Sequence, residues 1–310
     1  MFSGKPTRLT AALLAILVTI LWSTSFVLVK IGIKDIPSVT FAGLRYFIAF
    51  LCLLPFAFTP DNKKAIVNLK RKDWFRLFGI GILYYSITQG AIFVGLSYLP
   101  AITVNLLLNI SPVIVTLLGI ILLAENPSLL QGVGVLINLA GVILYFFPVS
   151  IFGGAWIGII AIFASVIANS FSAIINRKIN KSQRYPVMVL TLITMGFGSI
   201  VMLTGGIIVQ GLPPIQFVGW GIIIWMAVMN TAVAFTLWNY TLRTLTAMES
   251  SILNGAMLIE IAILAWIFLG ERMSVQQICG LVLAGTGAVL VQLHLKNRRN
   301  NIIEQPLEIG

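Results

Sequence analysis

Long runs of apolar residues make up most of the chain, and short polar segments separate them. Apolar and polar positions do not alternate within these runs, as they would in the strands of a membrane β-barrel, so the pattern favours helices. A helix needs about 20 apolar residues to cross the hydrocarbon core of a bilayer. The pattern therefore predicts ten membrane-spanning helices, at about residues 10–32, 38–58, 74–98, 101–123, 129–148, 154–176, 186–209, 217–241, 246–269 and 275–294.

The composition agrees with a membrane protein built largely of these spans. Of 310 residues, 9% are charged and 59% are hydrophobic, against about 25% and 45–50% in soluble domains. No Lys, Arg, Asp or Glu occurs in 77–124, 126–176 or 185–242, and each gap is long enough for two spans. These features exclude an ordinary soluble enzyme, a disordered chain and a disulfide-rich secreted domain, and they predict an all-α polytopic membrane protein.

The basic residues predict how the helices are oriented. If the N-terminus is cytoplasmic, sixteen Lys and Arg residues fall on the cytoplasmic side and three fall outside, at Lys30, Lys34 and Arg272. Cytoplasmic loops of membrane proteins carry such an excess. We therefore expect both termini in the cytoplasm and a location in the inner or plasma membrane. The net charge of +11 is explained by this loop bias facing anionic lipids, so no nucleic-acid partner is expected.

Motifs of common catalytic and metal centres are missing from the sequence. There is no HExxH, no GxxxxGK[ST] phosphate loop and no GxSxG elbow. The two cysteines, Cys52 and Cys279, lie in separate predicted spans, where we expect them to be small buried apolar residues. We predict a protein that is not an enzyme and that needs no metal or other cofactor, and the missing phosphate loop favours secondary over ATP-driven transport.

The two halves of the chain resemble each other at an offset of about 146 residues. Ala124-Glu125 and the following Ser128 match Gly270-Glu271 and Ser274, and Gly134 and Gly141 match Gly280 and Gly287. Each half contains five predicted helices, an odd number, so the halves must cross the membrane in opposite senses. Such inverted repeats are associated with alternating-access transport. We predict two five-helix repeats, at 1–150 and 151–296, and a short cytoplasmic tail at 297–310.

Together these features resemble the EamA-type transporters of the drug/metabolite transporter superfamily. The similar residues include Leu21-Trp22-Ser23-Thr24-Ser25-Phe26, Gly43-Leu44-Arg45-Tyr46, Ser111-Pro112-Val113 and Leu122-Leu123-Ala124-Glu125. The resemblance covers about 10–294 and implies a ten-helix fold with a central cavity, in a transporter of small metabolites. The chain departs from the family pattern at Leu258, where a proline is usual. It also has Thr194 opposite Arg45 when the repeats are aligned on their prolines.

Two charged residues fall deep within predicted spans. A lone charge in hydrocarbon is costly, so such residues usually face a cavity or a partner. The guanidinium of Arg45 could hold a substrate carboxylate or phosphate, or serve a structural ion pair. Glu260 is a candidate proton-coupling group, and Glu249 lies on the same helix face eleven residues earlier. Because Arg45 and Glu260 fall at similar depth, the two could also pair with each other.

Further polar residues in the spans are candidates for a substrate cavity. Pro112 cannot donate a backbone hydrogen bond, and Asn254 with Gly255 interrupts the ninth span near the position matching Asn109. Helices broken at matching positions in two halves indicate a binding site, so we expect Pro112 and Gly255 to mark gating breaks. Hydrogen bonding between helices is the alternative role for these polar groups. The candidates are Trp22, Ser25, Gln89, Asn105, Asn109, Asn169, Asn230, Trp238 and Asn254.

These expectations combine into a secondary transporter of small polar metabolites that works by alternating access. The resemblance favours export of amino acids or related metabolites, with uptake or exchange of sugars or nucleotide-sugars as the alternative. An intramembrane enzyme acting on lipid-linked substrates is the rival from another class. We expect membrane lipids, a small-molecule substrate and protons as partners, and a monomer or homodimer.

Overall fold

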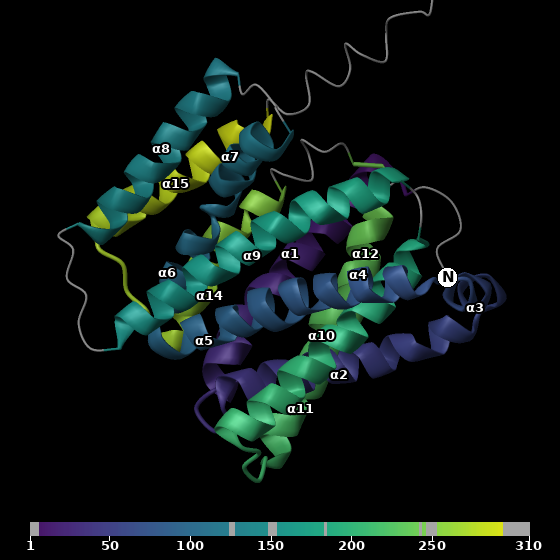
Figure 1. Cartoon of the computed structure of the whole chain (residues 1–310). Helices are drawn as coiled ribbons and strands as arrows, with labels where there is room; N and C mark the ends of the chain where they lie inside the picture. Colours follow the sequence, from purple (N-terminus) through teal and green to yellow (C-terminus); the bar gives the residue numbers. More distant parts are fainter. Residues whose placement is uncertain are drawn as a thin grey trace, which may run out of the picture.

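The computed structural model describes residues 6–123, 128–147, 154–182, 185–241, 244–245 and 253–293. Every regular element in these ranges is helical (Figure 1). The α-helices are α1 (Arg8–Gly32), α2 (Ser38–Leu53), α3 (Pro60–Val67), α4 (Arg71–Gly81), α5 (Gly90–Tyr98), α6 (Ala101–Leu108), α7 (Ser111–Leu123), α8 (Leu129–Phe146), α9 (Ala155–Ser182), α10 (Val187–Gln210), α11 (Phe217–Ala227), α12 (Ala234–Thr241), α14 (Met257–Leu269) and α15 (Val275–Leu293). A 3₁₀ helix, η1 (Leu54–Phe58), and two π-helices, η2 (Ile82–Gln89) and η3 (Val228–Val233), complete the elements.

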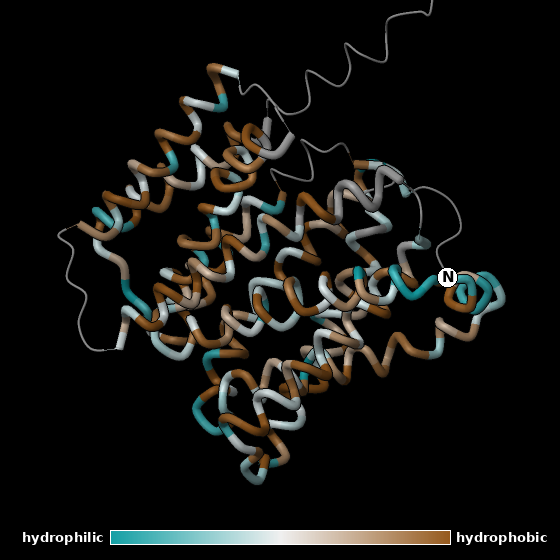
Figure 2. The backbone as a smooth tube through the Cα atoms, viewed as in Figure 1, coloured by the Kyte–Doolittle hydropathy of each residue, from teal (hydrophilic) through white to brown (hydrophobic). Residues whose placement is uncertain are grey.

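Eight helical stretches are long and apolar enough to cross a membrane within the described ranges. Two shorter apolar helices, Leu253–Leu269 and Val275–Val291, lie in the positions of the last two predicted spans. Figure 2 shows apolar residues along most of the helices and hydrophilic ones at α3. Large apolar side chains such as Leu136 and Ile208 are exposed, which fits an outer surface covered by lipid rather than water.

Several predicted spans are interrupted helices in the structure. The span predicted at 74–98 is built from α4, η2 and α5, and the one at 217–241 from α11, η3 and α12. The span at 101–123 is divided between α6 and α7. The sequence indicated only the last of these interruptions, because Pro112 follows it closely.

Helices α8 and α15 form the closest pair, and glycines allow their backbones to touch (Figure 1). A Cβ on Gly141 would lie 2.3 Å from the Ala284 nitrogen, and one on Gly287 would lie 2.3 Å from the Asn138 nitrogen. The second contact is the first with each residue replaced by the one 146 positions away. Side chains larger than hydrogen at these two glycines would therefore force the helices apart.

The turn between α5 and α6 is held from two sides by charged residues. The Nζ atom of Lys30 donates to the Leu96 and Leu99 carbonyl oxygens at 3.0 and 2.9 Å. The carboxylate of Glu271 accepts from the backbone nitrogens of Ala101 and Ile102, at 2.7 and 3.1 Å. Glu271 thus anchors a helix start, as the sequence suggested for the end of the span, while Glu125 lies outside the described residues.

The expectation of buried cysteines is wrong. Both Cys52 and Cys279 are free thiols with exposed side chains. A membrane protein directs apolar side chains outward as well as inward, so an apolar residue in a span does not indicate burial in the protein.

Candidate functional site

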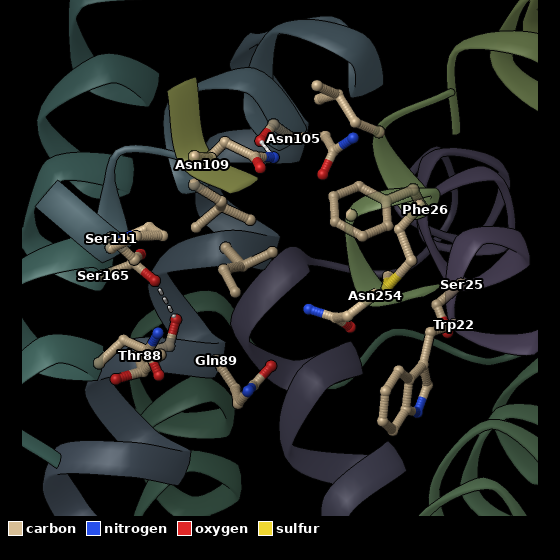
Figure 3. A pocket seen from close by; sticks show the side chains of 18 of the residues that line it. Trp22, Ser25, Phe26, Thr88, Gln89, Asn105, Asn109, Ser111, Ser165 and Asn254 are labelled. Atoms are coloured by element: carbon tan, nitrogen blue, oxygen red, sulfur yellow. Dashed lines mark hydrogen bonds between the residues drawn. The ribbon is translucent and has the colours of Figure 1, made fainter. Parts of the chain in front are cut away.

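A cavity of about 640 Å³ lies between helices from both halves of the chain. This volume is within the roughly 300–1,000 Å³ typical of small-molecule sites. Its walls come from α1, α2, η2, α5, α6 and α7 in the first half, and from α9, η3, α12, α14 and α15 in the second. Figure 3 shows Gln89 and Asn254 extending their amide groups toward the same central space, with Trp22 beside it.

Most of the polar residues singled out in the sequence line this one cavity. Several of them lie far apart in the chain and are brought together by the packing of the two halves. The lining residues among them are Trp22, Ser25, Arg45, Gln89, Asn105, Asn109, Pro112, Asn169, Asn230, Asn254 and Gly255.

Arg45 supplies the fixed positive charge of the lining. Its side chain is 6% exposed and its guanidinium lies against two aromatic rings, 5.1 Å from the centre of Tyr46 and 6.0 Å from that of Phe93. The Nε atom donates to the Thr231 hydroxyl at 3.3 Å. Among the described lining residues there is no Asp or Glu, so the polar wall favours a ligand with an anionic or hydrogen-bonding group.

Two amide groups in the lining have buried atoms without a partner among the described residues. The Nδ2 of Asn105, a donor, and the Oδ1 of Asn230, an acceptor, make no hydrogen bond. Leaving a buried polar group unpaired costs about 1–3 kcal/mol. A polar ligand in the cavity could relieve this cost at either residue.

The Gln89 amide is held in place by a neighbouring side chain. The Tyr46 hydroxyl donates to the Gln89 Oε1 at 2.8 Å. Because this bond occupies the carbonyl oxygen, the amide nitrogen is the part of Gln89 available for a ligand acceptor.

The helix interruptions lie beside the cavity in both halves. Helix α6 ends at Leu108, Asn109 folds its Nδ2 back onto the Asn105 carbonyl at 2.9 Å, and α7 resumes at Ser111. On the other side the helical turn at 253–255 is followed by a turn residue, Ala256, before α14. Pro112 and Gly255 therefore lie next to breaks that line the cavity, where the backbone has freedom to rearrange.

The structure does not bring Glu260 into the cavity or pair it with Arg45. Its two carboxylate oxygens accept from Thr19 and Ser23 of α1, at 2.9 and 2.8 Å, and it is not among the lining residues. The sequence gave the depth of both charges but not the rotation of α14, which packs on α1 and α6 rather than on α2. Glu249 lies outside the described residues.

Trp238 is the other candidate that does not line the cavity. Its ring packs on Trp22, with ring centres 5.2 Å apart, and Phe235 rather than Trp238 joins the lining. The sequence reasoning also missed Thr231, Thr19 and Ser23, since a hydroxyl in a membrane helix commonly bonds only to its own backbone. The charged residues they contact were the available signal.

Comparison with known proteins agrees with this arrangement. The sequence model of the EamA-like transporter family matches residues 9–147 and 156–293, nearly the whole chain in two consecutive stretches. The chain belongs to the EamA-like transporter family. Together with the apolar helices, this makes the chain a multi-pass membrane protein of a transporter family.

Relatives in this family align along almost their full length. YoaV of Bacillus subtilis, described as an uncharacterized transporter, is 22% identical over 293 residues, covering 91% of this chain and 96% of the relative. A probable amino-acid metabolite efflux pump of Escherichia coli is 24% identical over 297 residues, covering 92% and 96%. A solved crystal structure has the same fold, with a TM-score of 0.65 at 16% identity, over 92% of this chain and 98% of the other.

Proposed function

We propose that this protein is a secondary transporter that carries small polar metabolites across the membrane by alternating access. The observation that carries the proposal is the cavity of about 640 Å³ between the two halves of the chain, lined by amides, hydroxyls and one guanidinium inside an apolar helical bundle. Polar residues within membrane spans are costly unless they face a partner or an aqueous path. Their convergence on one cavity supports a solute-binding site.

The mechanism we propose uses ten spans arranged as two inverted five-helix repeats, 1–150 and 151–296. Support comes from contacts that recur at an offset of 146 residues. The contact of Gly141 with Ala284 has its counterpart in that of Gly287 with Asn138, and the π-helices begin at Ile82 and Val228. Two related halves around one cavity can open it alternately to either side.

We place the protein in the inner or plasma membrane with both termini, including the tail 297–310, in the cytoplasm. The excess of basic residues on the N-terminal side of the spans supports this orientation. It makes the turn held by Lys30 and Glu271 an outer one.

For the substrate we propose amino acids or related metabolites, moved outward. The relative described as an amino-acid metabolite efflux pump supports this, as does the match between a substrate carboxylate and Arg45. Sugars or nucleotide-sugars are the second candidate, because the amides of Gln89, Asn109, Asn169 and Asn254 also suit hydroxyl groups.

Proton coupling through Glu260 is part of the proposal. Its carboxylate joins α14 to Thr19 and Ser23 on α1, the helix that also carries Trp22 and Ser25 into the cavity. Among the elements packed on α14, α6 has no titratable residue and α1 carries only Arg8 and Lys30, near its ends. Protonation would weaken the two bonds to α1 and so affect a wall of the cavity.

Counterflow in proteoliposomes tests the proposed function. Purified protein is reconstituted, loaded with single amino acids, sugars or nucleotide-sugars, and tested for uptake of the labelled solute with and without a proton gradient. We expect saturable exchange that Asn105→Leu, in the cavity, reduces and that Thr204→Leu, on the exposed side of α10, leaves intact. Equal loss or equal activity in the two variants would refute the cavity as the transport site.

A further inference from the structure

Two π-helical turns occur at matching places in the chain. The turn η2 begins 146 residues before η3, and each continues directly from one α-helix into the next. Such turns are rare and frequently lie at functional sites. Both contribute residues to the cavity, among them Thr88 in η2 and Asn230 in η3.

The wider turn of η3 frees a carbonyl that a side chain can reach. The Thr231 hydroxyl donates to the Met226 carbonyl, five residues back, at 3.0 Å. Thr88 makes the same bond to Leu83 in η2, at 2.9 Å. Since donation to Met226 fixes the hydroxyl proton, the Thr231 oxygen is left as an acceptor, and it takes the bond from the Arg45 Nε at 3.3 Å.

This contact determines how the guanidinium meets the cavity. Thr231 is fully buried, so its oxygen is a fixed point for Arg45. Among the described residues the Nε bond is the one hydrogen bond from Arg45, and the Tyr46 and Phe93 rings lie against the group. The two terminal nitrogens are therefore left for a ligand, in the forked geometry that matches a carboxylate or phosphate.

The equivalent contact in the other half carries no charge. Residue positions 146 before Thr231 and 149 after Arg45 hold Tyr85 and Thr194, the second offset being that of Pro37 and Pro186. The Tyr85 side chain interacts with that of Thr194. One of two corresponding helix contacts thus holds a cation and the other only hydroxyls, which makes the cavity electrically asymmetric.

We infer that Thr231 is a positioning residue, which holds Arg45 so that its terminal nitrogens select solutes bearing a carboxylate or another anionic group. The inference rests on the proposed transport function and names the feature of the substrate that the site recognises. Thr231 does not itself need to touch the solute. Its loss should weaken recognition of the anionic group and leave transport of neutral solutes nearly unchanged.

The test compares Thr231→Val, which keeps the shape but loses the hydroxyl, with Thr231→Ser, which retains it. The probes are labelled L-leucine, as a carboxylate-bearing solute, and glucose, as a neutral one, each in proteoliposome counterflow, with other amino acids and sugars added if neither moves. Loss of a hydrogen bond to a charged group should raise the KM for the carboxylate solute about tenfold or more, with a smaller change in kcat. Thr231→Ser should restore the KM.

Thr194→Val is the matched control. Thr194 is also buried in a helix and donates to a backbone carbonyl, that of Leu190, at 2.7 Å, but it does not contact Arg45. Its replacement should leave the KM within about twofold of the unmodified protein, because the bond to the charged group is intact.

A double-mutant cycle separates positioning from general damage. In an Arg45→Lys background there is no Nε fork to hold, so Thr231→Val should add little further increase in KM. If Thr231→Val does not assemble, Thr231→Ala takes its place in the same cycle. An unchanged KM in the valine or alanine variant, equal losses for charged and neutral solutes, or full additivity with Arg45→Lys would overturn the inference while leaving the transport function in place. If the unmodified protein moves no solute in the screen, the proposed function fails and the inference falls with it.

Discussion

A methyl group added at Gly141 tests the close contact of α8 and α15 directly. In the Gly141→Ala protein the new Cβ would lie 2.3 Å from the Ala284 nitrogen and 2.6 Å from the Gly280 oxygen. Normal contacts of a Cβ begin near 3.4 Å, so the helices must separate locally by about 1 Å. Both opposing atoms belong to the backbone, and no side-chain rotation can relieve the overlap.

The expected cost follows from packing and from the bond that the separation strains. Overpacking costs about 1–3 kcal/mol, and weakening the 2.8 Å bond from the Asn138 Nδ2 to the Ala284 carbonyl costs about 1 kcal/mol more. Replacing a helical glycine by alanine returns up to about 1 kcal/mol. The net prediction is a destabilisation of about 1–3 kcal/mol.

Gly132→Ala in the same helix is the control, because a Cβ there would meet nothing within 4 Å. It should be neutral or stabilising. Gly287→Ala, whose Cβ would lie 2.3 Å from the Asn138 nitrogen, should behave like Gly141→Ala. Thermal unfolding of the purified proteins in one detergent measures the difference. A Tm for Gly141→Ala equal to or above that of Gly132→Ala would refute the reasoning.

Three further predictions concern charged residues. Glu260→Gln should abolish the pH dependence of transport while leaving exchange at one fixed pH, and flux measured over a series of external pH values checks this; an unchanged pH profile would rule out Glu260 as the coupling group. Thr19→Val together with Ser23→Ala should destabilise the protein by about 2–5 kcal/mol, because the carboxylate loses two partners, and unfolding by denaturant would show the loss, which the matched Glu260→Gln background should reduce. Glu271→Ala should destabilise the start of α6 by about 1–2 kcal/mol, seen as faster amide exchange at Ala101 and Ile102, with unchanged exchange counting against the capping role.

The positions of the helices could be predicted from the sequence because the physical signal is strong. About 20 apolar residues are required for every span, and loops contain the charges, so the segment ends are set within a few residues. The interruptions were harder. Pro112 signals a break through its missing N–H group, but η2 and η3 contain no proline, and their π-helical turns depend on tertiary contacts.

The lining of the cavity was predictable for a related reason. An Asn or Arg in a span must find a polar surrounding, so Asn105, Asn254 and Arg45 were identifiable by residue type alone. Residue type does not give the rotation of a helix, and that is why Glu260 faces α1 and Trp238 stacks on Trp22 instead of lining the cavity. Thr231 carried no signal because threonine is equally at home bonding to its own helix.

The central claim is that solutes pass through the cavity between the two halves. The most direct measurement is counterflow of a labelled solute into proteoliposomes that contain either the unmodified protein or Asn254→Leu, compared at equal amounts of folded protein. The account predicts saturable exchange by the unmodified protein and a loss of at least about tenfold in kcat/KM in the variant, equal to 1.4 kcal/mol or more of binding to the cavity wall. Exchange by Asn254→Leu at the rate of the unmodified protein would contradict it.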